Sequence, residues 1–177
     1  KGAKGGCEYA MNCLGRCYIN GRGIEKNEKK AVEWFCKAAE KGLPKSLWET
    51  YSAFANTYGG TILLGVEEHK EEIDPQKRYT VTNISNPQKL ITDFWNLIND
   101  PKKVNVNILV DEDVQVINVD GQDIIAIHIP QAAYNVRPVF INDNLQRGVF
   151  KRNYEGDYHC TEEEVKAAYA EKSDTDD

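Results

Sequence analysis

The stretch that decides the fold is residues 48–68, which read WETYSAFANTYGGTILLGVEE. Apolar side chains recur at helical spacing at Leu47, Tyr51, Phe54 and Tyr58, which predicts a helix with one apolar face, beginning at Pro44. Gly59-Gly60 tolerate backbone angles that other residues resist, so the helix is expected to stop there. The apolar run Thr61–Val66 then indicates a short strand covered on both faces.

The polar and small residues of the same stretch carry a family resemblance. The string Ser52-Ala53-Phe54-Ala55-Asn56-Thr57-Tyr58-Gly59-Gly60, followed by an apolar strand that ends in Gly65-Val66, resembles the Schlafen AlbA-type domain family. The resemblance covers about residues 43–165. Domains of this family occur in many bacterial transcriptional regulators and in animal Schlafen proteins. The resemblance therefore implies a regulator module, of bacterial type, that binds nucleic acid, with DNA as the expected target.

Residues 6–42 are predicted to form an αα-hairpin. Small residues such as Ala10 and Ala38 let two helices approach closely, and Gly21 and Gly23 permit a tight turn between them. The pattern resembles a SEL-one-like repeat, a relative of the tetratricopeptide repeat, and this resemblance implies contact with a protein partner. Because one such repeat cannot bury its own faces, we infer that the chain is a piece of a longer protein or that the hairpin docks on the next domain.

The junction between these two regions is open to two interpretations. AlbA-type domains commonly open with a strand just before the helix of the resemblance, and Val32–Lys37 occupies that place. Residues 31–41, however, hold good helix formers and no helix breaker, so local propensity favours a helix. If the helix is correct, the opening strand is missing, and the unfilled sheet edge invites pairing with a second chain in a homodimer.

The remainder of the chain predicts an α+β domain, with a mixed or antiparallel sheet packed with helices. Residues 67–77 read as a loop. Strands are expected at Tyr79–Ile84, Val104–Val110, Val114–Val119, Asp123–Ile129, Pro138–Asn142 and Gly148–Arg152, with a hairpin turn at Asp120-Gly121. One helix is expected to start at Asn86-Pro87, with asparagine as its cap and proline in the first turn. Another is expected from Thr161 to about Glu171, opened by a capping box of Thr161 and Glu164. We expect three parts: a helical repeat at 1–42, an AlbA-type domain at 43–172, and a disordered acidic tail at 173–177.

The overall charge argues against strong nucleic-acid binding by the chain alone. The formal net charge is -6, whereas phosphate binding usually comes with a basic excess. Affinity would have to come from a local patch, or from a dimer that presents two patches. Five cysteines without a disulfide-scaffold pattern indicate a reducing, cytoplasmic setting. No apolar run approaches the ~20 residues of a membrane helix, so no membrane partner is expected.

Four cations late in the chain are the candidate nucleic-acid contacts: Arg137, Arg147, Lys151 and Arg152. Arginine suits forked contacts with phosphate, and Tyr154 and Tyr158 could stack on unpaired bases. The segment Gly148–Arg152 also resembles a late feature of AlbA-type domains. The alternative is a solvated strand with ordinary surface charges.

Carboxylates offer a second reading, a metal-dependent ribonuclease of Schlafen type. The family's three acidic residues would correspond to Glu28, Glu33 and Glu67 or Glu68, which could hold a divalent cation. On a helix, residues five apart point about 140° apart, so the predicted helix opposes a shared metal site. We therefore expect no metal, no cofactor and, on balance, no enzyme. A protein-interaction scaffold without nucleic-acid binding is the third possibility.

Two further residue types are assigned structural roles. Asn56, near the end of its helix, is expected to bond local backbone and shape the turn. Cys13, Cys17 and Cys36 stand where repeats of this kind place small packing residues, so buried free thiols are expected rather than a zinc site.

Overall fold

The computed structural model describes residues 42–154 and 156–173 of the 177-residue chain, with the side chains of 171–173 left aside. The predicted helical repeat, except for Gly42, and the interpretation of Val32–Lys37 as helix or strand lie outside these residues. The last four residues of the predicted acidic tail lie outside them as well.

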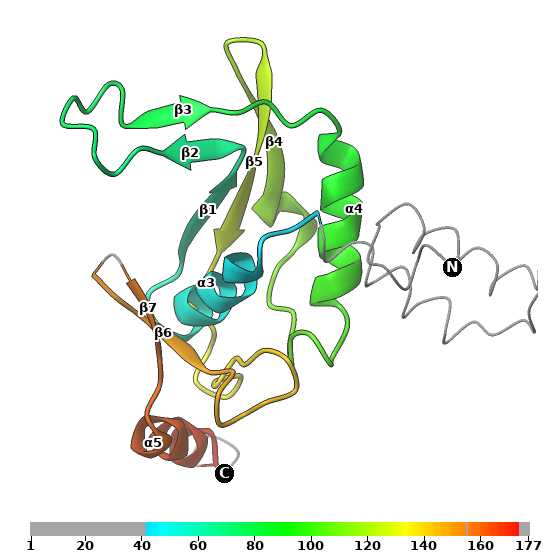
Figure 1. Ribbon diagram of the computed structural model, residues 1–177. Helices are drawn as coiled ribbons and strands as arrows, with labels where there is room; N and C mark the ends of the chain where they lie inside the picture. The colour runs from blue at the N-terminus through cyan, green and yellow to red at the C-terminus, as the bar shows by residue number, and fades with distance from the viewer. Residues whose placement is uncertain (1–41, 155, 174–177) are drawn as a thin grey trace, which may run out of the picture.

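A three-stranded antiparallel sheet carries the core. Its strand order is β1 (Gly60–Leu64), β5 (Gln122–Ile129), β4 (Val114–Val119). Helices α3 (Lys45–Asn56) and α4 (Pro87–Ile98) pack against it, and the rings of Trp48 and Phe94 stack between the two helices at 5.6 Å. The prediction of an α+β fold with an antiparallel sheet is confirmed for the described residues (Figure 1).

Two small hairpins complete the β-structure. Strands β2 (Val66–Glu68) and β3 (Tyr79–Val81) form a hairpin that projects beyond the sheet (Figure 1). Strands β6 (Phe150–Asn153) and β7 (Gly156–His159) form the other, which lies against α3. The chain then enters α5 (Glu162–Ser173), and a short 3₁₀ turn at Asp111–Asp113 (η2) precedes β4.

Local sequence signals account for several of these boundaries. Asn86 caps α4 by accepting a hydrogen bond from Lys89 N–H, with Pro87 in the first turn, as predicted. The capping box of α5 is also confirmed, because the side chains of Thr161 and Glu164 each accept from the other's backbone N–H. The Asp120-Gly121 turn joins β4 to β5, and both residues have positive φ.

The reversal after α3 depends on two glycines, though the helix ends earlier than predicted, at Asn56. Gly59 has φ +75° and donates to Phe54 O at 2.9 Å, so it closes the reversal in a conformation that favours glycine. A Cβ on Gly60 would stand 2.5 Å from the Phe54 ring. The two positions therefore require glycine for different reasons, one conformational and one steric.

Two strand predictions are wrong in detail. β1 is not covered on both faces: its residues alternate between half-buried and exposed, and Leu63 is 48 % exposed. Residues 104–110 do not form a strand. The Tyr51 hydroxyl instead donates to Val106 O and accepts from Ile108 N–H, taking up backbone groups that a neighbouring strand would otherwise have bonded.

Other boundaries also differ from the prediction. The expected strand at Pro138–Asn142 contributes only isolated bridges, and the strand expected at Gly148–Arg152 begins at Phe150. Residues 66–68 pair as β2, where the charged sequence indicated a loop from residue 67. Residues 156–159 pair as β7, which was not predicted.

Candidate functional site

The polar residues of α3 bind the backbone of distant segments. Ser52 is fully buried, and its Oγ donates to Val139 O at 2.8 Å and accepts from Phe150 N–H at 3.0 Å. Asn56 Nδ2 donates to Val139 O at 2.8 Å and to Phe150 O at 3.0 Å, while its Oδ1 accepts from Val139 N–H at 2.8 Å. The expectation that Asn56 bonds only local backbone is therefore wrong.

Thr57 completes this set from the residue that follows the helix. Its Oγ1 donates to Ala53 O and accepts from Arg152 N–H at 2.9 Å. We call Ser52, Asn56 and Thr57 the α3 clamp. Because the clamp satisfies backbone groups that β6 and residue 139 leave unpaired, it fixes where the side chains of β6 project.

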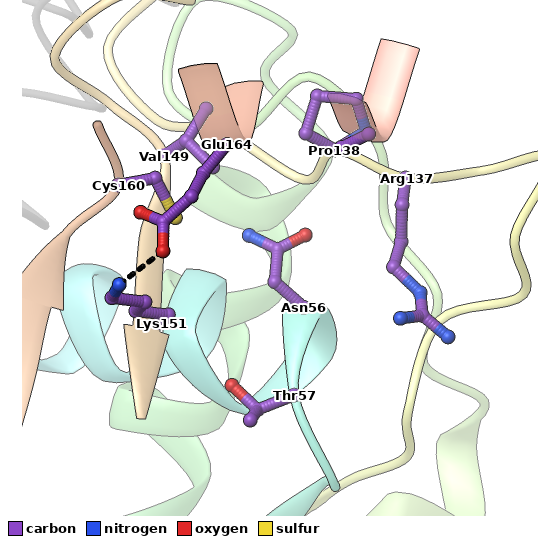
Figure 2. A pocket seen from close by; sticks show the side chains of 9 residues that line it. Asn56, Thr57, Arg137, Pro138, Val149, Lys151, Cys160 and Glu164 are labelled. Carbon is purple, nitrogen blue, oxygen red and sulfur yellow. Dashed lines mark hydrogen bonds and ion pairs between the residues drawn. The ribbon is translucent and has the colours of Figure 1, made fainter. Parts of the chain in front are cut away.

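A pocket of about 260 Å³ opens beside the clamp, and we call it the α5 pocket. Asn56, Thr57, Arg137 and Lys151 line it from the body of the domain. Cys160, Glu164 and Ala168 line it from the C-terminal segment. Figure 2 shows Lys151 and Glu164 on one side of the pocket, Arg137 and Pro138 on the other, and Asn56 between them.

Lys151 is paired with a carboxylate inside this pocket. Its Nζ lies against Glu164 Oε1, and both side chains are about two-fifths exposed. Hydrogen bonding to Glu164 raises the pKa of Lys151, and the same bond lowers the pKa of Glu164. The pair is therefore fully ionised at neutral pH, and Glu164 covers the charge that was predicted to meet phosphate.

Arg137 has a different environment. Its Nε donates to Ala132 O at 2.8 Å, and its guanidinium lies 4.4 Å from the centroid of the Tyr134 ring. Tyr134 itself is 60 % exposed. The arrangement places the guanidinium over an aromatic ring, which leaves the remaining N–H donors available for an incoming acceptor.

Arg152 and Arg147 lie outside the pocket lining. Arg152 Nη1 pairs with Asp157 Oδ1 at 2.9 Å, and its guanidinium lies over the Phe54 ring. Arg147 is exposed in the loop before β6, where its backbone N–H donates to Asn144 Oδ1. The structure thus brings Arg137 and Lys151 together, and it neutralises Lys151 and Arg152 with carboxylates.

The carboxylates of the nuclease reading are not assembled in the described residues. Glu67 and Glu68 are exposed on β2, and Glu28 and Glu33 lie outside the described residues. Within residues 42–154 and 156–173, no three His, Cys, Asp or Glu side chains gather closely enough to hold a metal ion.

Cys160 brings a thiol, a potential nucleophile, to the α5 pocket, but the environment of this thiol suppresses its reactivity. Burial raises the pKa of Cys160 to about 11, and the negative charge of Glu164 adds to the rise. Since the thiolate is the reactive form, this thiol is inert near neutral pH.

Sequence reasoning missed the clamp and the part that Glu164 plays in the pocket. A signal for the clamp was present, because Ser52 and Asn56 are polar residues four apart and the three residues between them are apolar. Glu164 was recognised only as a capping residue. Nothing in the local sequence indicates that its second oxygen reaches a lysine thirteen residues earlier.

The comparison with protein families agrees with the motif. The family model described as Schlafen, AlbA_2 matches residues 24–161, more than half of the chain. This chain therefore belongs to the Schlafen AlbA_2 family. The match begins inside the segment for which a helical repeat was predicted and ends near the predicted limit of residue 165.

One solved structure with a related sequence is the N-terminal domain of an ATP-dependent DNA helicase RecG-related protein from Nitrosomonas europaea. It shares 25 % identity, covers 68 % of this chain and 78 % of its own, and superposes with a TM-score of 0.49. No curated protein matches the chain. Among the described residues, no helix is long and apolar enough to cross a membrane.

Proposed function

We propose that this chain is a nucleic-acid-binding module, with DNA as its main ligand, and that it contacts the phosphate backbone around the α5 pocket. The observation that carries the proposal is that Arg137 and Lys151, from two different segments of the chain, line one pocket. The exposed Tyr134 ring lies beside Arg137. The nucleic-acid role that family membership implies points the same way.

The charges divide the four candidate cations into two kinds. Lys151 and Arg152 have carboxylate partners, so a phosphate must compete for them. Arg137 and Arg147 have no ion-pair partner among the described residues, so a phosphate can meet them without displacing a carboxylate. With a net charge of -6 on the whole chain, affinity depends on this local face and falls steeply with salt.

Exposed tyrosines favour contact with unpaired bases. Tyr154 is 94 % exposed at the turn between β6 and β7, and Arg152 Nε donates to its backbone carbonyl at 3.2 Å. Tyr158 on β7 and Tyr134 beside Arg137 are also exposed. Aromatic faces next to cations suit stacked bases together with their phosphates.

The wider role follows from the resemblances. We propose a transcriptional regulator, working in the cytoplasm of a bacterium, in which residues 1–42 contact a protein partner and residues 43–172 bind DNA. A homodimer would present two such faces at once and raise the affinity of an otherwise acidic chain.

The proposal is tested by titrating the full chain into fluorescein-labelled single-stranded DNA, duplex DNA and RNA of matched sequence. We expect salt-dependent binding that is tightest for single-stranded DNA. Arg147→Glu and Arg137→Gln should each weaken binding and reduce the slope of log affinity against log salt by about one unit. Lys77→Glu is the matched control, because it reverses a charge on the distant β2–β3 loop and should weaken binding far less.

Thermal melts of each variant separate lost binding from lost folding. The proposal is wrong if the wild-type chain binds none of the three ligands at low salt. It is equally wrong if the two arginine variants, still folded, bind as the wild type does.

A further inference from the structure

Glu164 holds the position on Lys151 that an anionic ligand would take. Its carboxylate contacts Lys151 Nζ inside the α5 pocket, across from Arg137 (Figure 2). A carboxylate and a phosphate oxygen make the same kind of charge-assisted hydrogen bond to an ammonium group. The pocket therefore already contains an anion, supplied by the chain itself.

Few apolar contacts hold the helix that carries this carboxylate. Among the described side chains of α5, Val165 alone is buried. A pocket of about 160 Å³ is lined both by the preceding loop, with Leu145 and Gln146, and by the helix, with Val165. In Figure 1, α5 lies at one end of the domain, beyond the β6–β7 hairpin. A helix with a single buried side chain among those described, and with an exposed ion pair to Lys151, can leave its place at modest cost.

The charge of the same segment opposes nucleic acid. Glu162, Glu163 and Glu164 form the first turn of α5, and residues 161–177 hold two basic and seven acidic residues. In its present place the first turn of α5, with Glu162, Glu163 and Glu164, puts negative charge at the edge of the cationic face. A phosphate that approaches Lys151 meets repulsion from the helix as well as an occupied lysine.

We propose that α5 is an internal competitor for the nucleic-acid face: Glu164 occupies the place of a backbone phosphate on Lys151, and nucleic acid displaces it. The inference rests on the proposed function and adds regulation to the same site. Binding is then coupled to the release of α5, and the observed affinity is lowered by the fraction of molecules in which the helix is closed. Anything that holds α5 elsewhere strengthens binding.

Glu164→Gln is the decisive variant, since glutamine preserves the capping box while it removes the charge. We expect this full-length variant to bind fluorescein-labelled single-stranded DNA about three- to tenfold more tightly than the wild type at low salt. Glu163→Gln is the matched control: it makes the same charge change on the same turn, without an ion-pair partner in the described part of the chain. It should tighten binding much less.

Two further measurements separate displacement from a general charge effect. In a Lys151→Gln background, Glu164→Gln should have no more effect than Glu163→Gln, because the lysine for which the carboxylate competes is absent. In wild-type protein, saturating oligonucleotide should speed amide hydrogen exchange in α5.

The outcomes also distinguish this inference from the proposed function. If the wild type binds but Glu164→Gln matches Glu163→Gln, or α5 stays protected in the complex, the competitor is rejected and the binding module stands. If no variant binds at low salt, both are rejected.

Discussion

The α3 clamp and helix α5 are held to the rest of the domain in different ways. At the α3 clamp, buried Ser52 and half-buried Asn56 satisfy backbone groups of residues 139 and 150 with several hydrogen bonds. At α5, Val165 is the one buried side chain among those described, and the ion pair between Lys151 and Glu164 is exposed. The polar residues of the motif that carries the family resemblance thus stabilise the domain, whereas the charged groups able to meet a ligand lie at its exposed edge.

Breaking the clamp should produce the largest effect on stability. Asn56→Asp replaces two N–H donors with a carboxylate oxygen that faces the carbonyls of Val139 and Phe150. An unpaired charge next to two acceptors should lower the free energy of unfolding by about 4 kcal/mol. Chemical denaturation at neutral pH measures this loss.

Asn86→Asp is the control for that substitution. Asn86 caps α4 at the surface by accepting from Lys89 N–H, and aspartate caps equally well. Its unfolding curve should match the wild type's. If Asn56→Asp were as stable as Asn86→Asp, the clamp would contribute no more to stability than a surface helix cap does.

The sequence predicted the elements whose signals are local. The caps at Asn86 and Thr161 and the hairpin turn at Asp120-Gly121 are set by residues within a few positions of each other, and the structure has all three. No strand forms at residues 104–110, where one was expected, because the alternation of apolar and polar residues there reflects burial alone. Its backbone bonds to the Tyr51 hydroxyl, a partner more than fifty residues away that no local pattern reveals.

Tyr51, which is fully buried on α3, should make the stability of the domain depend on pH in the alkaline range. Burial raises the pKa of Tyr51 to about 12, against the opposing effect of the hydrogen bond from Ile108 N–H. Between pH 10 and pH 12 the unfolded chain therefore loses this proton first, and the free energy of unfolding falls as pH rises. The contribution is complete below pH 10, and its loss amounts to about 2–3 kcal/mol.

This titration is read as a difference between proteins. Tyr51→Phe should lack that part of the alkaline decline, whereas Tyr58→Phe, at a residue 88 % exposed, should keep it. Equal alkaline profiles for the wild type and Tyr51→Phe would show that Tyr51 ionises as an ordinary surface phenol does.

The candidate site was harder to predict than the fold. The sequence selected Arg137 and Lys151, and the structure places both at one pocket, but sequence spacing says nothing of charge partners. Glu164 and Asp157, which neutralise Lys151 and Arg152, lie on separate elements whose packing decides the pairs. A count of cations therefore overestimates the positive charge available to a ligand.

The smallest stability effect is expected at the α5 end. Glu164→Gln removes an ion pair whose two side chains are both well exposed, and pairs of this kind contribute little. Because the pKa of Glu164 is lowered, whatever the charge contributes is present above its ordinary value of 4.5 and is lost as pH falls through the folded value. At neutral pH, the denaturation midpoint should match the wild type's, while amide exchange in α5 becomes faster. A loss of stability as large as that of Asn56→Asp would make α5 part of the core, and a helix anchored so firmly could not yield Lys151 to a phosphate.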